Sequence, residues 1–506
     1  MTLFTRRALS LLTASALLAG LFLGAPTSVR ATPQTYYVGK HDNDYAPGSE
    51  CADPDYWTDG DWTGGGAYNS YNDAIQDAAD IAASGSIIYL CAGTYVFLEV
   101  VTIGAGKSLT FRGDGDQTVL DGNDITRIFN ASPVNESDQG GVLSLRDMFI
   151  MDAEVTEWNA GAVVADGLSL DNVTITRTQG AFNGGALYAE GNVTIVDSTF
   201  TDNIATADGG VLYAWNGART VSISNSVFDG NTAGFQGGAV LAANVTVTGS
   251  TFTENNAYAG GAIFATTTAT VTISTFTDND AAFSSGGAIF APAATVANSI
   301  FRGNDAASSG GAITSSTATV ISSNFTDNNA YVGGAIYSDT TATISSSAFT
   351  SNSAVLGGAI GSGNVNATAS TFTDNDAMVF GGAIYAWLSA AIVRSTFASN
   401  DGGEVGGAIY ASSATIARSR FTRNTAGAHG GAVTLAFPSS ADLPKLRGNT
   451  FSRNTAPSGG ALTLGSCVAP SRSQAARVQR ANRFSGNRAT EQRRTRNIER
   501  WAGNCI

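Results

Sequence analysis

Aromatic residues recur in this chain directly after a Gly-Gly-Ala-aliphatic motif. Side chains alternate along a strand, so an inward aliphatic residue implies that the next residue faces outward. A row of exposed rings can stack on sugars or contact a protein partner. The candidate ligand-binding residues are Tyr188, Tyr213, Trp215, Phe264, Phe290, Tyr337, Tyr385, Trp387 and Tyr410. A covering loop, or stacking that only stabilises the fold, would account for the same residues.

Carboxylates form a second repeated set, placed on either side of a recurring asparagine. Ca²⁺ prefers several oxygen ligands, and stacked carboxylates could supply them. The candidate calcium ligands are Asp278, Asp280, Asp374 and Asp376. A solvated acidic row that discourages aggregation explains the same residues, and we prefer this interpretation. We therefore expect no cofactor, with Ca²⁺ as the alternative.

A repeat of about 24 residues positions both sets. Twelve copies of F-x-x-N occur between Phe200 and Asn487, and a Gly-Gly pair begins eight to ten residues after each of the first eleven phenylalanines. Only three to six residues of β-type sequence lie between turn signals, which is too short for a helix. The pattern predicts an all-β chain forming a single right-handed parallel β-helix with three short strands per coil.

Each position of the repeat has a physical role in such a coil. The phenylalanines should point inward and stack, with each burial worth roughly 1.5–3 kcal/mol. The asparagine three places later should turn inward at a corner and bond backbone groups of its own and neighbouring coils. Gly-Gly should provide a bend that a side chain would obstruct. These residues are expected to be scaffold.

The two ends of a solenoid need covers, because open ends expose sheet edges and core. A helix is predicted to begin at Ser70, with Ile75, Ala78, Ala79 and Ala82 on one face, and to end before Gly85. The Arg-rich segment after Cys467 is expected to form an irregular cap at the other end. The expected divisions are a signal peptide (1–31), an N-terminal cap and first coil (32–100), β-helix repeats (101–466) and a C-terminal cap (467–506).

The beginning of the chain predicts export. Arg6 and Arg7 precede an apolar run, and Val29-Arg30-Ala31 offers a small-x-small cleavage site. No later stretch is apolar enough to span a membrane. Export makes disulfides plausible, and four cysteines allow three connectivities. We favour the two local pairs, Cys51 with Cys91 and Cys467 with Cys505.

Charge is unevenly distributed along the chain. With 27 basic and 41 acidic residues the net charge is −14, and removal of the signal peptide with its three arginines makes it −17. Residues 471–506 hold nine Arg and two Glu, so they carry +7 and residues 32–470 carry −24. An acidic body repels phosphate backbones, which argues against nucleic acid as a partner. The basic tail could bind acidic polymers, although a solvated surface is the preferred interpretation, and we expect a monomer.

The alternation of F-x-x-N with G-G-A-I, from Ile175 to Asn487, resembles the repeat of the polymorphic outer membrane protein family. That resemblance implies surface exposure and a role in adhesion. The segment from Ala74 to Asn123, with Ile-Ile-Tyr-Leu-Cys-Ala-Gly-Thr-Tyr, is similar to the first coils of pectate-lyase-like β-helix proteins. Lyases of that kind use aligned Asp residues for Ca²⁺ with an Arg or Lys base, and the related hydrolases use clustered Asp.

Residues suited to catalysis are few in this chain. Basic residues are scarce in the central repeats, and the histidines are His41 and His429. Ala428-His429-Gly430-Gly431 is similar to a Gly-His-Gly element of the hydrolases, but alanine replaces its first glycine. Other repeats have Ser, Val, Leu or Phe in the slot of His429, which favours a variable turn residue. We assign no catalytic residue.

These observations lead to three functional hypotheses. The first is an exported extracellular or cell-surface protein of adhesin type, which binds a glycan or a surface protein through the exposed faces of the rod without catalysis. The second is a polysaccharide lyase or glycoside hydrolase on the same scaffold. The third is a purely structural spacer. The fold does not choose among them, because function depends on the site.

Overall fold

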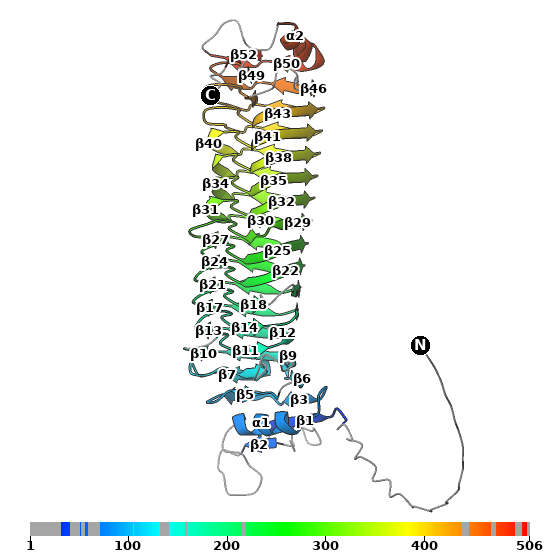
Figure 1. The fold of residues 1–506 in the computed structure, drawn as a ribbon, viewed down its shortest axis with the longest axis vertical. Helices are drawn as coiled ribbons and strands as arrows, with labels where there is room; N and C mark the ends of the chain where they lie inside the picture. The colour runs from blue at the N-terminus through cyan, green and yellow to red at the C-terminus, as the bar shows by residue number, and fades with distance from the viewer. Residues whose placement is uncertain are drawn as a thin grey trace, which may run out of the picture. The chain divides into compact units, whose positions relative to one another are not determined.

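The computed structural model describes residues 32–40, 51, 56–58, 71–104, 106–131, 141–156, 159–214, 219–436, 445–466, 472–490 and 498–502. The expected signal peptide, Trp215, Cys467 and Cys505 lie outside the described residues. From Pro33 onward the chain forms one unit, in which about 14 turns stack into a column (Figure 1). Strands of successive turns pair in parallel, as in Phe276 with Phe301 and Phe301 with Phe325. The predicted parallel β-helix is confirmed.

Each full coil contains the same strands in the same order. The Gly-Gly strand, named for the glycine pair before it, is followed by a second strand, and in many coils the two run on as one. The Phe strand and the short Asn strand complete the coil before the next glycine pair. Most coils in which the first two strands are continuous have three strands, as predicted, and several other coils have four. In the coils of Phe397 and Phe421, isolated β-bridges at Asp401 and Thr425 take the place of the Asn strand.

The first two columns merge where strands are continuous. The Gly-Gly column holds β5 (Val101–Thr102), β8 (Phe129–Ala131), β11 (Val163–Ala165), β14 (Leu187–Ala189), β18 (Leu212–Ala214), β28 (Ile289–Phe290), β45 (Val433–Leu435) and β49 (Leu462–Ser466). The second column holds β3 (Ile87–Leu90), β6 (Leu109–Arg112), β15 (Val193–Val196), β19 (Thr220–Ser224), β29 (Ala293–Ala297) and β46 (Lys445–Arg447). Continuous strands are β22 (Val240–Thr248), β25 (Ile263–Thr272), β32 (Ile313–Ile321), β35 (Ile336–Ser345), β38 (Ile360–Thr368), β41 (Ile384–Val393) and β43 (Ile409–Ala417).

The other two columns follow the corners of the coil. The Phe column holds β4 (Gly93–Val96), β7 (Thr118–Asp121), β16 (Thr199–Thr201), β20 (Val227–Asp229), β23 (Thr251–Thr253), β26 (Thr275–Thr277), β30 (Ile300–Arg302), β33 (Asn324–Thr326), β36 (Ala348–Thr350), β39 (Thr371–Thr373), β42 (Thr396–Ala398), β44 (Arg420–Thr422), β47 (Thr450–Ser452) and β50 (Arg483–Ser485), and β9 (Val142–Met151) and β12 (Gly167–Thr176) join it to the second column. The Asn column holds β10 (Glu154–Val155), β13 (Gln179–Gly180), β17 (Ile204–Ala205), β21 (Thr232–Ala233), β24 (Asn256–Ala257), β27 (Asp280–Ala281), β31 (Asp305–Ser309), β34 (Asn329–Val332), β37 (Ser353–Leu356), β40 (Asp376–Phe380), β48 (Thr455–Ala456) and β51 (Arg488–Ala489).

The Phe strands contribute the largest side chains of the core. From Phe200 to Phe451 every phenylalanine of the repeat is fully buried. Neighbouring rings stack with centroids 4.6–5.0 Å apart and planes within 16° of parallel. This separation is close to the spacing of paired strands, so the rings stack because the strands are in register. The predicted inward stack of phenylalanines is confirmed.

An asparagine ladder occupies the corner after each Phe strand. The Asn304 side-chain amide donates to Asn328 Oδ1 at 2.9 Å and to the Phe276 carbonyl oxygen of the preceding coil at 3.1 Å. The Asn304 backbone N–H also donates to Asn328 Oδ1, at 3.1 Å. The same pattern runs from Asn203 to Asn454, and it satisfies buried polar groups that would each cost about 1–3 kcal/mol if left unpaired. This ladder is the predicted one.

A second ladder, formed by serines, was not predicted. The residue two places before each repeat phenylalanine is Ser or Asn, and it is buried at the corner between the second strand and the Phe strand. The Ser299 N–H donates to Ser323 Oγ at 3.1 Å, and Ser299 Oγ donates to the Ala297 carbonyl oxygen at 2.8 Å. Hydroxyl side chains are common everywhere in this Ser- and Thr-rich chain, so the recurrence of serine at this one position of the repeat was not recognised.

Each coil bends at three residues with left-handed backbone. In the coil of Phe301, Asn298 (φ 52°) precedes the Ser corner and Gly303 (φ 63°) precedes the Asn corner. Gly310 (φ 59°) is the first residue of the Gly-Gly pair. Asn, Asp and Gly tolerate this conformation best. The second glycine has another role: a Cβ on Gly287 would overlap the Gly311 carbonyl oxygen of the next coil, so the coils could not approach.

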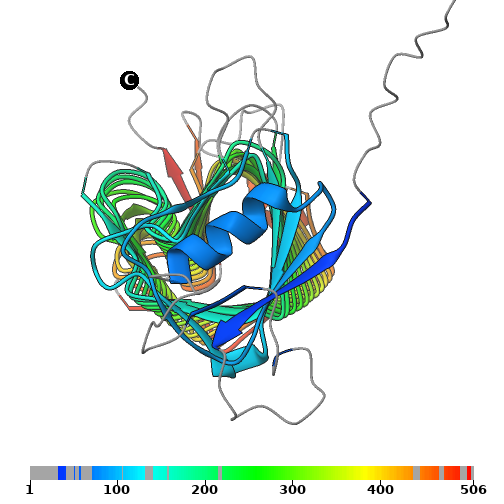
Figure 2. The same cartoon turned by 90° about the horizontal axis from the view of Figure 1, so that it is seen from below.

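The two ends of the column each carry a helix. α1 (Tyr71–Ile81) lies across the first coil (Figure 2), and the residues buried beneath it are Ile75, Ala78, Ala79 and Ala82, as predicted. The predicted Cys51–Cys91 disulfide is present, and it joins the segment before α1 to the end of β3. β1 (Thr35–Lys40) pairs with β2 (Tyr56–Thr58) and β3. A short 3₁₀ helix, Gly115–Gln117, precedes β7.

At the C-terminal end, the segment that was expected to form the cap is more regular than its sequence suggested. The Arg-rich segment contains α2 (Arg472–Ala481), and β52 (Ile498–Ala502) pairs with β49. Val478 of α2 is buried, and the Asn482 amide donates to its carbonyl oxygen at 2.7 Å. The segment is strongly polar because of its arginines, which is why the helix was missed.

We predict that Phe325→Ala lowers stability by about 3–5 kcal/mol around its own coil, because the substitution leaves a cavity between Phe301 and Phe349. Hydrogen exchange of the backbone amides in the adjoining strands would measure this local loss. Thr326→Ala, which changes the neighbouring outward residue, is the control and should have little effect. A loss below about 1 kcal/mol for Phe325→Ala would contradict a close-packed stack.

Candidate functional site

The outward residues of the Gly-Gly strands form the predicted aromatic row. Tyr188 pairs in register with Tyr213, Phe264 with Phe290, and Tyr385 with Tyr410. The residue before each of them is fully buried and the ring itself is partly exposed. The predicted outward orientation is therefore confirmed for the eight candidates among the described residues.

The row is divided into three groups of rings. Tyr188 stacks on Tyr213 with centroids 5.4 Å apart, and Phe264 stacks on Phe290 at 4.6 Å. The coils between the groups have other residues in the same outward place, Leu241 and Thr314. The eight described candidates do not form one continuous surface, and the third group is the largest.

The third group contains five rings and is called the aromatic cluster here. Its members are Tyr337, Phe380, Tyr385, Trp387 and Tyr410. Trp387 lies 5.9 Å from both Tyr337 and Tyr385, measured between ring centroids. Phe380 stacks on Tyr410 at 4.7 Å and lies 6.0 Å from Tyr385. The cluster draws on three coils and two strand columns.

Two glycines of β38 lie beneath the aromatic cluster. Gly361 stands between Tyr337 and Tyr385 in the outward row, where a Cβ would overlap Val332 Cγ1. A Cβ on Gly363 would lie 3.4 Å from Trp387 Nε1, so the indole lies over this part of β38. Trp387 lies equally close to Tyr337 and Tyr385 and so joins the two tyrosines into one surface.

Phe380 was missed from the sequence. It ends β40 directly before Gly381 and belongs to a row of apolar residues beside the aromatic cluster. Strand pairing and a β-bridge place Val332, Leu356, Phe380 and Val405 in successive coils of this row. The slot before Gly-Gly was noted as variable, but nothing in the sequence indicated that it lies next to the row of tyrosines.

The tyrosines of the cluster are neutral hydrogen-bonding groups at pH 7. Burial, together with a 2.8 Å hydrogen bond that the hydroxyl donates to Asp339 Oδ1, raises the pKa of Tyr337 to about 12. Burial also raises the pKa values of Tyr385 and Tyr410. The phenols can therefore donate and accept hydrogen bonds at their edges, while the ring faces offer apolar surface.

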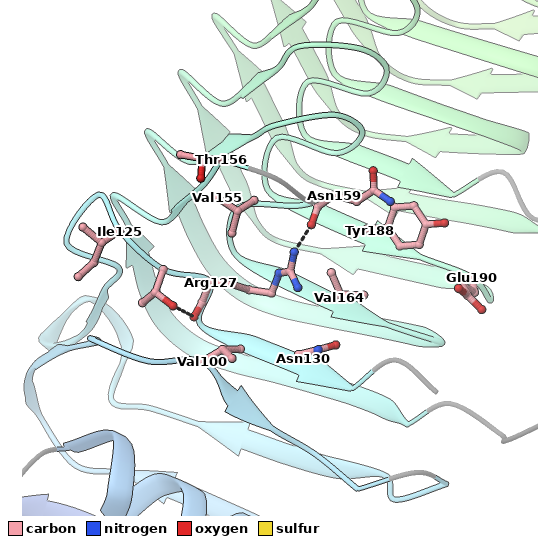
Figure 3. A pocket seen from close by; sticks show the side chains of 11 residues that line it. Val100, Ile125, Arg127, Asn130, Val155, Thr156, Asn159, Val164, Tyr188 and Glu190 are labelled. Carbon is pink, nitrogen blue, oxygen red and sulfur yellow. Dashed lines mark hydrogen bonds between the residues drawn. The ribbon is translucent and has the colours of Figure 1, made fainter. Parts of the chain in front are cut away.

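A groove of about 650 Å³ lies at the N-terminal end of the same row (Figure 3). Asn130, Val164 and Tyr188, which occupy successive outward places, form part of its wall. Arg127 and Glu190 contribute charged groups, and Asn159 lies beside the guanidinium (Figure 3). The groove and the aromatic row are thus parts of one side of the column.

Arg127 is the most unusual residue of the groove. Its Nε donates to the Ala160 carbonyl oxygen at 3.0 Å and its Nη2 donates to the Asn159 carbonyl oxygen. Burial lowers its pKa to about 10, so it remains a cation at pH 7. Among the described residues no carboxylate forms an ion pair with it. Sequence reasoning overlooked Arg127, because the loop that surrounds it belongs to the next coil.

The predicted calcium ligands occupy two kinds of position. Asp278 and Asp374 have left-handed backbone (φ 52° for both), which explains why Asp recurs before the ladder asparagine. Asp280 and Asp376 lie in the Asn column, where each stands beside another carboxylate, Asp305 or Asp401. In the part of the chain described by the structure, no three His, Cys, Asp or Glu residues lie close enough to hold a metal ion.

His429 and Lys107, whose residue types could serve in catalysis, occupy structural positions. His429 follows Val405 and precedes Ser458 in a row of β-bridges, as a variable turn residue would. Lys107 donates to the carbonyl oxygens of Ala79 and Asp80 at the end of α1, at 2.7 and 2.8 Å.

Within the described chain, no helix has the length and apolar character needed to cross a membrane.

Comparison with known proteins supports the fold class. A family model described as a right-handed β-helix region matches residues 134–306, about a third of the chain. Together with the parallel solenoid topology, this match shows a right-handed parallel β-helix. No curated protein is significantly similar in sequence.

Several solved structures are weakly similar. A mannuronic-acid-specific polysaccharide family 6 lyase from human gut microbiota is 11% identical, with a TM-score of 0.29, over 79% of this chain and 85% of its own. Tailspike protein 3 of bacteriophage CBA120 is 12% identical, with a TM-score of 0.29, over 86% and 59%. The A-module of an Azotobacter vinelandii mannuronan C-5 epimerase is 12% identical, with a TM-score of 0.26, over 83% and 94%. These superpositions are too weak to support a functional assignment.

We predict that Asp280→Asn stabilises the protein at pH 7. Burial and the charge of Asp305 raise the pKa of Asp280, so its ionised form costs stability in the folded state. Because the pKa is raised in the folded state, the carboxylate is ionised, and costs stability, above the folded pKa. The cost disappears as the pH falls through that pKa and the carboxyl group is protonated. The gain in thermal midpoint should therefore be present at pH 7 and shrink as the pH falls through the carboxyl range towards 4.

Asp327→Asn, a charge-removing substitution in a turn away from the pair, is the control. The same denaturation series with and without CaCl₂ tests the calcium hypothesis. If added Ca²⁺ raised the midpoint of the unmodified protein and Asp280→Asn abolished that rise, the acidic row would have to be reinterpreted as a cation site.

Proposed function

We propose that this protein is exported and acts as an adhesin-type protein that binds a glycan through the aromatic cluster, without catalysing a reaction. The observation that carries this proposal is the single surface formed by the partly exposed rings of Tyr337, Phe380, Tyr385, Trp387 and Tyr410. Export is inferred from the N-terminal sequence, with its basic start, apolar run and small-x-small site.

The chemistry of the cluster suits a sugar chain. Flat ring faces cover the apolar C–H faces of sugar rings, and the tyrosine hydroxyls reach sugar hydroxyls at the margin. Tyr385 and Tyr410 repeat at the spacing of the coils, with ring centroids 5.7 Å apart, so a linear ligand could contact successive rings. Val332, Leu356 and Val405 extend the apolar surface beside the rings, which would exclude water from bound ligand.

A second candidate function is a polysaccharide lyase or glycoside hydrolase acting in the groove of Arg127. The observation that favours it is a largely buried cation in a groove that adjoins the aromatic row. Because Arg127 stays protonated near neutral pH, it would neutralise a substrate carboxylate rather than accept a proton. Release of unsaturated or reducing sugars from a panel of polysaccharides, abolished by Arg127→Gln, would establish this function in place of the first.

We predict that Tyr385→Ser combined with Trp387→Ser weakens glycan binding at least tenfold, because the double substitution divides the aromatic cluster. Affinity electrophoresis through gels containing a panel of neutral and acidic polysaccharides would measure the change. Phe283→Ser is the matched control, since Phe283 is 73% exposed and lies outside the cluster. Both variants should fold normally, because the substituted rings lie on the outside of the coil.

Unchanged binding of the double variant would contradict the proposal. If neither the unmodified protein nor the variant binds any polysaccharide of the panel, the spacer hypothesis is favoured. Turnover of a bound polysaccharide by the unmodified protein would favour the enzyme instead.

A further inference from the structure

The last four coils carry a dense group of exposed basic side chains on and around the Phe column. This group, called the basic patch here, consists of Arg394, Arg418, Arg420, Arg423, Lys445, Arg447, Arg453, Arg477, Arg480, Arg483 and Arg488. All eleven side chains are exposed. Among the described residues none of them forms an ion pair. The charges are therefore available to a partner.

Strand register brings these residues together. Arg420 and Arg483 occupy the same outward place of the Phe strands, two coils apart, with Thr450 between them. Arg394 and Arg418 precede the Ser corner of successive coils. Arg423 and Arg453 precede the Asn corner of successive coils. The patch thus covers the Phe strands and both corners over a length of about 15–20 Å along the column.

Four of the arginines stand where the fold prefers other residues. Arg394, Arg418, Arg423 and Arg453 have left-handed backbone, with φ between 52° and 59°. Glycine, Asn and Asp fill many of the equivalent places in other coils, because a larger side chain is disfavoured there. Arginine in four neighbouring left-handed turns is an unfavourable choice for folding, and it concentrates positive charge at the two corners.

The sign of the charge reverses along this side of the column. We compare four places per coil: the residue before each corner and the two outward residues of the Phe strand. In the eight coils from Phe200 to Phe372 these places hold seven acidic residues and one arginine. The acidic residues are Asp197, Asp202, Asp229, Glu254, Asp278, Asp327 and Asp374, and the arginine is Arg302. The basic patch is therefore a bounded site and not a general property of the column.

We infer that the basic patch binds an acidic polysaccharide. Ten of its eleven charged groups are arginines, whose planar guanidinium groups match carboxylate or sulfate oxygens in bidentate fashion. Hydroxyl groups lie between them on the outward face, and Thr422 Oγ1 lies 3.1 Å from Ser452 Oγ. Arginines alternating with hydroxyls suit a polymer that presents both anionic groups and sugar hydroxyls.

Other polyanions fit the patch less well. Single-stranded nucleic acids are held largely by stacking of bases on aromatic rings, and neither the patch residues nor the outward residues between them, Thr396, Thr422, Thr450 and Ser452, are aromatic. A duplex or an anionic membrane surface is longer than the patch along the column and would meet Asp374 and Asp327. A single polysaccharide chain can cross four coils without reaching them.

This site is separate from the aromatic cluster. The cluster lies on the Gly-Gly strands and the end of the Asn column, whereas most of the patch lies on the Phe strands, the two corners beside them, the end of the second column and α2. Arg488 is in the Asn column, several coils beyond Phe380. Failure of glycan binding at one surface therefore leaves the other surface to be tested independently.

The test compares the unmodified protein with Arg418→Gln/Arg420→Gln/Arg423→Gln in binding to polygalacturonate, with neutral dextran as the uncharged probe. The unmodified protein should bind polygalacturonate, bind less tightly as NaCl is increased, and ignore dextran at this surface. The triple variant should lose at least tenfold in affinity. Arg302→Gln, an outward arginine in an acidic coil, is the matched control for Arg420→Gln and should bind like the unmodified protein.

Four results would overturn the inference. The first is equal binding of polygalacturonate by the triple variant when its thermal midpoint is unchanged. The second is tighter binding of a single-stranded oligonucleotide or of anionic vesicles than of polygalacturonate. The third is a salt-sensitive dimer, seen by sedimentation velocity and lost in the triple variant, without polysaccharide binding, which would assign the patch to the acidic coils of a second copy. Loss of polygalacturonate binding in Tyr385→Ser/Trp387→Ser alone would assign that ligand to the aromatic cluster.

Discussion

The structure depends on the hydrogen bonds that join each coil to the next at its two buried corners. The Asn304 side-chain amide donates to Asn328 Oδ1, and the Ser299 backbone N–H donates to Ser323 Oγ, so each corner pairs with the equivalent residue of the next coil. A shift of one residue would leave these groups unpaired in the core, where each would cost about 1–3 kcal/mol. The corners therefore fix the register. The stacking of the phenylalanines and the close approach of Gly287 to Gly311 follow from that register.

The same constraint leaves the outward residues free. Inward places repeat as Phe, Asn, Ser and Gly in nearly every coil, whereas the outward place of the Gly-Gly strand holds Tyr, Phe, Leu, Thr or Gly. Residues that sit in equivalent places become neighbours on one side of the column whatever their type. A surface such as the aromatic cluster can therefore arise by substitution in adjacent coils without disturbing the core, and the change to arginine in the last coils is a second example.

Features that repeat along the chain could be predicted from the sequence, and features produced by packing between different columns could not. The Phe stack, the Asn ladder and the outward tyrosines follow from spacing, because residues at the same position of successive repeats lie in direct contact. The helix α1 follows from the helical spacing of its apolar residues. Phe380 and Arg127 gain their importance from residues of another column or another coil. The Asp residues before the ladder asparagine suggested a cation, but the left-handed turn there is a sufficient reason for them. The helix α2 was hidden by its many arginines.

The asparagine ladder has a direction. In the bonds between side chains of the ladder, every residue donates to the later coil and accepts from the earlier one. The series runs from Thr178, which donates to Asn203, through to Asn454, which donates to Asn487. A completed coil thus presents unpaired N–H groups on the side where the next stretch of polypeptide arrives, and that stretch brings the matching oxygen. A chain that emerges amino end first could therefore close its turns one after another, each on a template already formed, so that assembly would be vectorial.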